Sequence, residues 1–183
     1  MKFFETTLKG AFTIELEPHR DKRGFFARTF CKDEFRAIHH QKEFVQFNHS
    51  YTRKKGTLRG LHYQVPPMSE NKLIRCIRGK VFDVIVDMRK GSPTFLQYFG
   101  VELSGKDMRM IYVPEGFAHG FQTLEEHSEM LYYHTNFYSG EHERGVRYND
   151  PLLQVQWPLE PAEISEKDMK HQFLTEDFKG ITI

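Results

Sequence analysis

The sequence has little cysteine and no long apolar run. Its 183 residues include two cysteines, Cys31 and Cys76, too few for a disulfide framework and typical of a reducing compartment. No apolar stretch approaches the roughly 18 residues that a membrane-spanning helix needs, and the N-terminus lacks the basic and apolar regions of a signal peptide. These absences argue against a secreted disulfide scaffold and predict a cytoplasmic protein that does not act on a membrane.

An excess of one charge is also absent. Lys and Arg total 26 and Asp and Glu total 25, with no polybasic run. Nucleic acid is therefore not an expected partner, although a few local arginines can still hold an anionic ligand. The chain also has no Gly-x-Gly-x-x-Gly and no P-loop pattern, the usual marks of a dinucleotide or nucleotide cofactor.

Short β-rich runs separated by Gly and Pro fill most of the chain, which is 14% aromatic with 17 Phe and 8 Tyr. The clearest strand is 81–87, rich in β-branched residues, and Arg78-Gly79 predicts a tight turn that joins it to 73–77. A short helix is expected over 33–39 with Asp33 as its N-cap, and a helical turn at 165–168. Further strands are predicted over 12–17, 24–30, 44–50, 58–63, 98–103, 109–113, 120–124 and 129–137. This pattern predicts a single all-β domain over 1–183, a jelly roll or cupin-type double-stranded β-helix with a few short helices.

Two segments look like the halves of a cupin barrel motif whose metal site has been dismantled. The first half keeps Gly56 and His62, but Gln64 replaces its second histidine, and Lys72 stands where the motif has a carboxylate. The second half, Pro114-Glu-Gly-Phe-Ala-His119, is intact. An ammonium group among the ligands would repel a divalent ion, so we expect no metal, and His62, Lys72 and His119 are free for other chemistry.

The combination of Arg59, His62 and Lys72 indicates an anion-binding pocket that contains a base. Three cationic or protonatable groups near one barrel mouth are costly to bury without an anionic ligand. For His62 alone, a core histidine bonded to a backbone carbonyl is the ordinary interpretation, as is packing for Tyr132 or Tyr138 and a solvated charge for Asp168. A tyrosine that faces a histidine across a substrate would make an acid–base pair able to invert a carbon centre.

Nearly the whole chain resembles the dTDP-4-dehydrorhamnose 3,5-epimerase family of deoxysugar nucleotide synthesis. The order and spacing of its motifs are specific to that family: Arg23-Gly-Phe-Phe26, Gln46-Phe-Asn48-His-Ser50, Leu58-Arg-Gly-Leu-His62, Lys72-Leu-Ile-Arg-Cys76, Phe82-Asp-Val-Ile-Val-Asp-Met-Arg89, Ser92-Pro-Thr-Phe95, 114–121, Asn149-Asp-Pro151, Trp157-Pro158 and Ser165-Glu-Lys-Asp168. The resemblance implies a nucleotide-diphosphate sugar substrate, no cofactor, and a homodimer with exchanged N-terminal strands.

The resemblance also assigns roles to residues. It implies that His62 is the base, oriented by Asp168, that Tyr132 is the acid on the opposite face, and that Lys72 stabilises the enolate oxygen. For substrate binding, it implies that Arg59 and Arg23 of the neighbouring subunit contact the diphosphate. Phe26, Gln46 and Asn48 would contact the nucleoside. Tyr138 would lie near the sugar, and His119 would lie in the barrel with a less defined role.

Arg28 departs from the family pattern, which commonly has Glu at this position. A carboxylate accepts a hydrogen bond from N3–H of thymine, whereas a guanidinium has no acceptor. Arg28 therefore either selects another base, in a CDP- or GDP-linked sugar, or contacts a phosphate while Gln46 and Asn48 hold thymine. Of these, dTDP is the favoured nucleotide, and the sequence leaves hexose and heptose sugars open.

Several other functions share these features. A C3-only epimerase and a ketoisomerase need the same base and enolate, a sugar-nucleotide-binding cupin needs only the pocket, and a metal-dependent cupin oxygenase is the weakest alternative. Seven further histidines are predicted to form no ligand-spaced cluster and to be surface or core residues: His39, His40, His49, His127, His134, His142 and His171.

Overall fold

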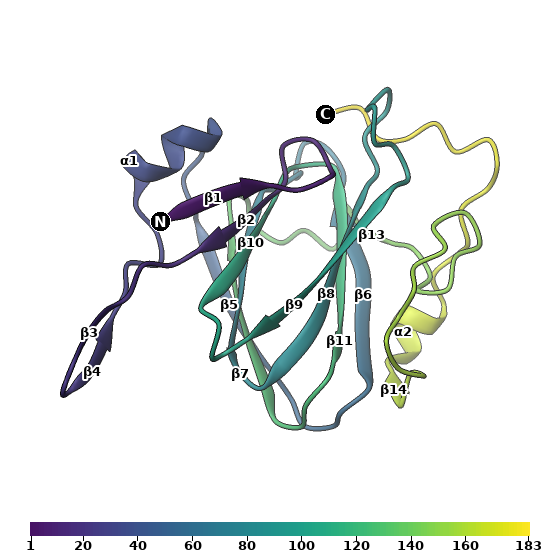
Figure 1. The fold of residues 1–183 in the computed structure, drawn as a ribbon. Helices are drawn as coiled ribbons and strands as arrows, with labels where there is room; N and C mark the ends of the chain where they lie inside the picture. Colours follow the sequence, from purple (N-terminus) through teal and green to yellow (C-terminus); the bar gives the residue numbers. More distant parts are fainter.

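The computed structural model describes residues 1–183 as two facing β-sheets of a jelly roll (Figure 1). The first sheet has the order β1 (Lys2–Glu5), β2 (Phe12–Glu15), β10 (Arg109–Val113), β7 (Lys72–Arg78), β12 (Ser128–His134) and β5 (Gln46–Thr52). The second has the order β13 (Glu143–Gly145), β6 (Thr57–Gln64), β11 (Phe117–Thr123), β8 (Lys80–Asp87) and β9 (Tyr98–Ser104), and β14 (Glu163–Ile164) pairs with β6. The predicted all-β fold is confirmed.

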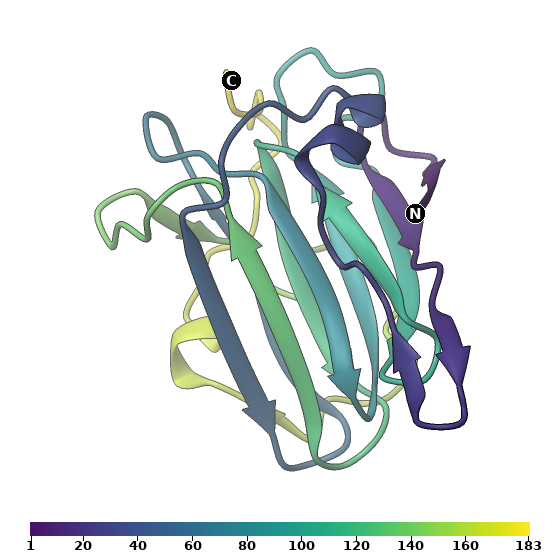
Figure 2. The same ribbon diagram turned by 90° about the vertical axis from the view of Figure 1, so that its left-hand side faces the viewer.

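Three short helical segments and one hairpin complete the fold. The hairpin of β3 (His19–Asp21) and β4 (Gly24–Phe26) extends away from the two sheets (Figure 1). The helical segments are α1 (Lys32–Phe35), the 3₁₀ turn η1 (Arg36–Ile38) and α2 (Glu166–Met169). Figure 2 shows α1 and η1 in front of the first sheet, while α2 belongs to the C-terminal segment beside the second. None of the helical segments has the length and hydrophobicity of a membrane-spanning helix.

Apolar side chains form three layers rather than one core. Ile74, Ile85 and Phe121 lie in the cluster between the sheets. The outer face of the second sheet is covered by residues of the C-terminal segment, such as Leu153. Phe35 of α1 packs on the outer face of the first sheet. Because both sheets are covered on both sides, strands such as β8 are apolar on both faces, which explains the uninterrupted run at 84–86.

The turn at Arg78-Gly79 is confirmed and has a clear physical cause. Gly79 has a φ of +70°, a conformation that strains residues with a Cβ. An added Cβ would also lie 2.5 Å from Ser128 Oγ. Glycine is therefore the residue that lets β7 turn into β8 here.

The two helix predictions had different outcomes. The helical turn expected at 165–168 is confirmed as α2, and Ser165 is its N-cap, since the Ser165 Oγ accepts a hydrogen bond from the Asp168 backbone N–H at 3.1 Å. The prediction that Asp33 caps the first helix is wrong. That helix begins one residue earlier, Cys31 occupies the N-cap without a side-chain hydrogen bond, and Asp33 lies in the first turn. A carboxylate in the first turn still interacts favourably with the free backbone N–H groups there.

Candidate active site

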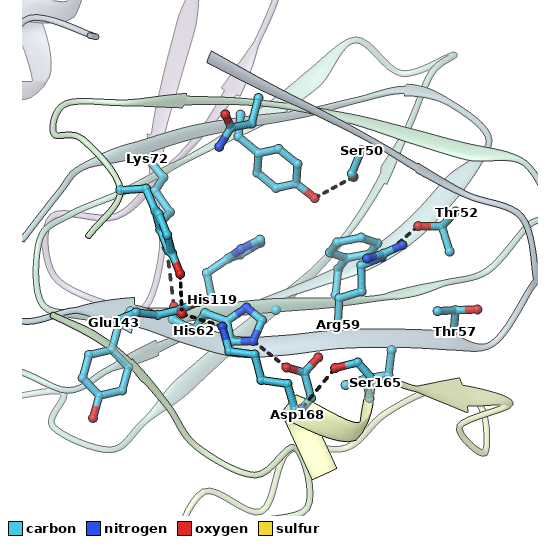
Figure 3. Close-up of a pocket in the computed structure, with 18 of the residues that line it drawn as sticks. Ser50, Thr52, Thr57, Arg59, His62, Lys72, His119, Glu143, Ser165 and Asp168 are labelled. Carbon is cyan, nitrogen blue, oxygen red and sulfur yellow. Dashed lines mark hydrogen bonds and ion pairs between the residues drawn. The ribbon is translucent and has the colours of Figure 1, made fainter. Parts of the chain in front are cut away.

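A cavity of about 580 Å³ is lined by residues of both sheets and of the C-terminal segment. It brings together these predicted residues: Asn48, Arg59, His62, Lys72, His119, Tyr132, Tyr138 and Asp168. Figure 3 shows most of their side chains pointing into this space. Residues more than a hundred positions apart in sequence therefore share one pocket.

His62 and Asp168 form the shortest contact among these predicted residues. His62 Nε2 lies 2.7 Å from Asp168 Oδ1 (Figure 3). The other carboxylate oxygen accepts the Gly60 N–H at 3.2 Å. Burial alone would raise the pKa of Asp168, but the His62 and Gly60 hydrogen bonds outweigh it, and the pKa is lowered. An ionised Asp168 keeps the proton of a neutral imidazole on Nε2 and leaves the lone pair on Nδ1. The arrangement therefore prepares Nδ1 to accept a proton.

Tyr132 belongs to the opposite sheet. Its hydroxyl lies 3.1 Å from Ser50 Oγ, and its ring centroid is 6.1 Å from that of His119. Burial, the largest influence, raises the pKa of the Tyr132 phenol far above its ordinary value. The hydroxyl therefore remains protonated at neutral pH. The next residue, Tyr133, packs instead among the residues on the outer face of the sheet, as strand alternation requires.

Lys72 is buried and lies in a chain of polar contacts. Its Nζ is 3.3 Å from Glu70 Oε1, and Glu70 Oε2 is 3.0 Å from His134 Nδ1. The chain continues to Asn48, whose Nδ2 is 3.3 Å from His134 Nε2. Burial would raise the pKa of Glu70, but the contacts with His134 and Lys72 together lower it. An ionised Glu70 thus compensates the buried ammonium of Lys72.

Glu70 and His134 are functional candidates that the sequence analysis missed. The sequence pattern that could have identified them is their spacing from predicted site residues. Glu70 precedes Lys72 by two residues, and His134 follows Tyr132 by two residues on β12. Side chains two positions apart on a strand point to the same face. An acidic or imidazole group at such a spacing from a site residue is therefore a reasonable candidate for the same pocket.

His119 and Arg59 differ in their surroundings. His119 is directly opposite His62 in the β6–β11 pairing, and its Nε2 lies 2.9 Å from Asp83 Oδ2 in the interior. Arg59 is exposed at the cavity, and its Nε donates to Thr52 Oγ1 at 3.1 Å. Arg59 has no carboxylate partner in the structure, so its guanidinium is available for an anion.

Gln46 and Tyr138 are joined by a backbone contact. The Tyr138 N–H donates to Gln46 Oε1 at 3.0 Å, and the Tyr138 hydroxyl donates to Glu143 Oε2 at 3.0 Å. Gln46 Nε2 lies 3.4 Å from Asn48 Oδ1, although Gln46 itself does not line the cavity. The two predicted nucleoside-binding polar residues are thus neighbours at its edge.

Within one chain, Arg23, Phe26 and Arg28 lie away from the cavity. Arg23 pairs with Asp21 at 2.5 Å on the projecting hairpin, where Phe26 is 72% exposed. Arg28 pairs with Glu34 at 2.6 Å. The structure of a single chain therefore does not bring these three predicted substrate-binding residues to the others.

The prediction that His171 joins no ligand-spaced cluster is wrong. Its Nε2 lies 3.6 Å from Asp168 Oδ1, and ligand atoms of His62, Asp168 and His171 all lie within 4.8 Å of one another. The cause is the end of α2, which places residues three apart on one side. At the former cupin metal position, by contrast, the Gln64 amide bonds the backbone of Met68, Phe137 and Ser139.

Comparison with known proteins agrees with this geometry. The family model of dTDP-4-dehydrorhamnose 3,5-epimerase matches residues 5–176. The chain is 43% identical over 180 residues to the dTDP-4-dehydrorhamnose 3,5-epimerase of Shigella flexneri, covering 97% of this chain and 99% of the relative. The most informative solved structure is a dTDP-6-deoxy-D-glucose-3,5-epimerase of Legionella pneumophila in complex with dTDP-4-keto-L-rhamnose. It has a TM-score of 0.90 and 40% identity, and the match covers 94% of this chain and 92% of that one.

A structure with a narrower activity has the same fold. ChmJ, a 3′-monoepimerase of Streptomyces bikiniensis crystallised as a variant with dTDP, has a TM-score of 0.86 and 30% identity, over 92% of this chain and 85% of that one. Both 3,5-epimerases described above are more similar in sequence, at 43% and 40% identity, and match over more than nine tenths of each chain. This chain belongs to the dTDP-4-dehydrorhamnose 3,5-epimerase family.

Proposed function

We propose that this chain is an isomerase that inverts C3 and C5 of dTDP-4-dehydro-6-deoxy-D-glucose, giving dTDP-4-dehydro-L-rhamnose. One observation carries the proposal: His62, oriented by Asp168, and Tyr132, kept protonated by burial, lie on opposite sheets and line the same cavity. A sugar between them meets a base on one face and an acid on the other.

The chemistry requires only these groups and the substrate ketone. The C4 carbonyl acidifies the hydrogens on C3 and C5. His62 Nδ1 removes one as a proton, the C–H electron pair moves into the enolate, and negative charge develops on the C4 oxygen. Lys72 stabilises that oxygen; a preorganised donor of this kind contributes about 2.7–4 kcal/mol. The Tyr132 hydroxyl then donates its proton to carbon from the opposite face, and the centre is inverted.

The nucleotide binds, in this proposal, at the Asn48 end of the cavity, with Arg59 on the diphosphate. Arg59 suits this role because no carboxylate neutralises it. A second arginine would come from a homodimer, in which the projecting hairpin inserts into the neighbouring subunit. The exposure of Phe25 and Phe26 on that hairpin supports the exchange, which would bring Arg23 and Phe26 to the partner's nucleotide. Sedimentation of the free protein as a monomer would contradict it. A cytoplasmic location remains a prediction.

Product analysis tests the proposed function. The protein is incubated with the dTDP-, CDP- and GDP-linked 4-keto-6-deoxyglucose, and proton coupling constants in the sugar ring report the configuration at C3 and C5. We expect both centres of the dTDP sugar to be inverted. Inversion at C3 alone would favour the monoepimerase alternative, and movement of the carbonyl would favour a ketoisomerase. Binding without conversion of any of the three would indicate a sugar-nucleotide-binding protein.

Arg28→Glu is expected to raise the preference for dTDP over CDP sugars by about tenfold, measured as a ratio of kcat/KM. A carboxylate accepts the N3–H of thymine, one net hydrogen bond of about 1–1.5 kcal/mol, whereas cytosine has no proton there. Arg36→Glu is the matched control, because Arg36 is an exposed helix arginine paired with Asp33. An unchanged ratio in Arg28→Glu would show that this position does not contact the base.

Glu70→Gln is expected to lower kcat by about tenfold, or ~1.4 kcal/mol in the barrier, with little change in dTDP affinity. The amide keeps the shape of Glu70 but removes the negative charge beside the Lys72 ammonium, so the ammonium is held less firmly at the C4 oxygen. Steady-state kinetics and calorimetry with dTDP measure the two effects. Glu102→Gln is the control, since Glu102 also pairs with a lysine, Lys80, and neither residue lines the cavity. Equal loss in both variants would argue against a specific role for Glu70.

A further inference from the structure

His171 is a second imidazole beside the Asp168 carboxylate, which orients His62. Its side chain is 16% exposed, that of Asp168 is 5% exposed, and that of His62 is 33% exposed. His171 Nε2 is buried and has no hydrogen-bond partner. A buried imidazole nitrogen without a partner is uncommon, and this one points toward the carboxylate.

The surrounding backbone leaves room for this imidazole. A Cβ built on Gly145 of β13 would lie 2.2 Å from His171 Nε2, so any larger residue there would displace the ring. The ammonium groups nearby are compensated: Lys167 pairs with Glu143 at 2.5 Å and Lys72 with Glu70 at 3.3 Å. These ion pairs reduce the repulsion that the two ammonium groups would exert on a cation bound at this cluster.

Two imidazoles and one carboxylate form a suitable ligand set for a divalent transition-metal ion. With metal–ligand bonds of about 2.0–2.1 Å, tetrahedral ligand atoms lie about 3.4 Å apart. Here Asp168 Oδ1 is 2.7 Å from His62 Nε2 and 3.6 Å from His171 Nε2. Small side-chain movements would bring all three to bonding distance.

We propose that His62, Asp168 and His171 form an inhibitory binding site for Zn²⁺, with its open coordination position toward the cavity. The proposed inhibition rests on the proposed function, whereas the metal binding does not. The site shares His62 with the cupin motif, but its other two ligands, Asp168 and His171, come from the C-terminal segment.

Inhibition follows from the tautomer of His62. In the metal-free site Nε2–H is donated to Asp168, and Nδ1 holds the lone pair that removes the substrate proton. A neutral imidazole that binds Zn²⁺ through Nε2 carries its proton on Nδ1. The base then has no lone pair to offer, while Asn48 and Arg59 are untouched. Zn²⁺ is therefore expected to reduce kcat without displacing the nucleotide.

Titration of the chelator-treated full chain with Zn²⁺, by calorimetry without substrate, tests the site. We expect one ion per chain and a loss of affinity of at least about 10–100-fold in His171→Gln, because even outer partners of metal ligands contribute that much. Co²⁺ should give the absorption bands of a tetrahedral complex. His142→Gln is the control, because His142 lies outside the cavity and bonds Ser139. Absence of binding, or equal affinity in His171→Gln, would overturn the proposal.

Kinetics separate this proposal from the proposed function. At saturating Zn²⁺ we expect kcat to fall at least about tenfold, dTDP affinity to be unchanged and EDTA to restore activity. Each variant is compared with its own metal-free rate, and on that scale His171→Gln should lose the inhibition. Zn²⁺ that competes with dTDP, or that inhibits His171→Gln equally, would contradict the tautomer mechanism. Binding that depends on His171 in a protein that epimerises none of the three sugars would support the site and refute the proposed function.

Discussion

His62→Ala is expected to lower kcat by about 10²–10⁴-fold, the range for loss of a general base, with dTDP affinity within about twofold of the unaltered protein. His62 is held by the buried carboxylate of Asp168 and is open to the substrate, whereas His119 and His134 are buried on Asp83 and Glu70. His49 also lines the cavity but pairs with Glu129 rather than with a buried carboxylate. Water does not replace it efficiently, because a correctly placed base also saves the entropy of bringing one to the carbon.

The measurement for this prediction is turnover together with deuterium exchange into the substrate. Both centres depend on the same base, so exchange at C3 and at C5 should fall together. Asp168→Asn should give a smaller loss, since it disturbs the tautomer of His62 without removing the imidazole. His142→Ala is the control for histidine loss. Thermal unfolding of each variant excludes a general loss of structure. Retained exchange at either carbon in His62→Ala would assign abstraction there to another group.

Tyr132→Phe is expected to separate proton abstraction from inversion. The variant keeps the ring and His62 but loses the only hydroxyl proposed to deliver a proton from the opposite sheet. Formation of inverted product should fall by about 10²–10⁴-fold. Substrate in D₂O should still gain deuterium with retained configuration, because His62 can return a solvent-derived proton to the face from which it removed one.

The adjacent Tyr133 provides a matched control. It lies on the same strand but packs on the outer face of the sheet, near Phe44 and Phe47. Tyr133→Phe removes an equivalent hydroxyl without touching the cavity and should leave inversion intact. Because burial raises the pKa of Tyr132, ionisation of this phenol should not reduce activity in the neutral to mildly alkaline range. Full inversion by Tyr132→Phe would require a different proton donor.

The local sequence pattern was sufficient to predict the central strands but not to predict where several strands end. Residues 81–87 lie within β8, and 73–77 lie within β7, because β-branched runs and a glycine turn determine both. The strand expected over 24–30 ends at Phe26, and the one expected over 129–137 ends at His134. Where a strand ends depends on its neighbours in the sheet, which the local sequence does not specify.

The candidate site also has a part that was predicted from the sequence and a part that was not. The contact of His62 with Asp168 spans 106 positions, and only resemblance to a family, rather than any local pattern, indicates it. The roles of these residues remain predictions. Glu70 and His134 were missed because an acidic or histidine residue near a strand is usually a solvent-facing or core residue. His171 was missed because only its contact with Asp168, three residues earlier, makes it a candidate site residue. That contact depends on α2, which buries the Asp168 side chain.

The most direct test of the central claim is proton NMR of the unaltered protein in D₂O with dTDP-4-keto-6-deoxyglucose. The account predicts that deuterium enters both C3 and C5 and that both positions appear inverted in the product, with both signals lost in His62→Ala. Deuterium at C3 alone would contradict double epimerisation. Deuterium at neither carbon would contradict the assignment of this cavity to proton transfer.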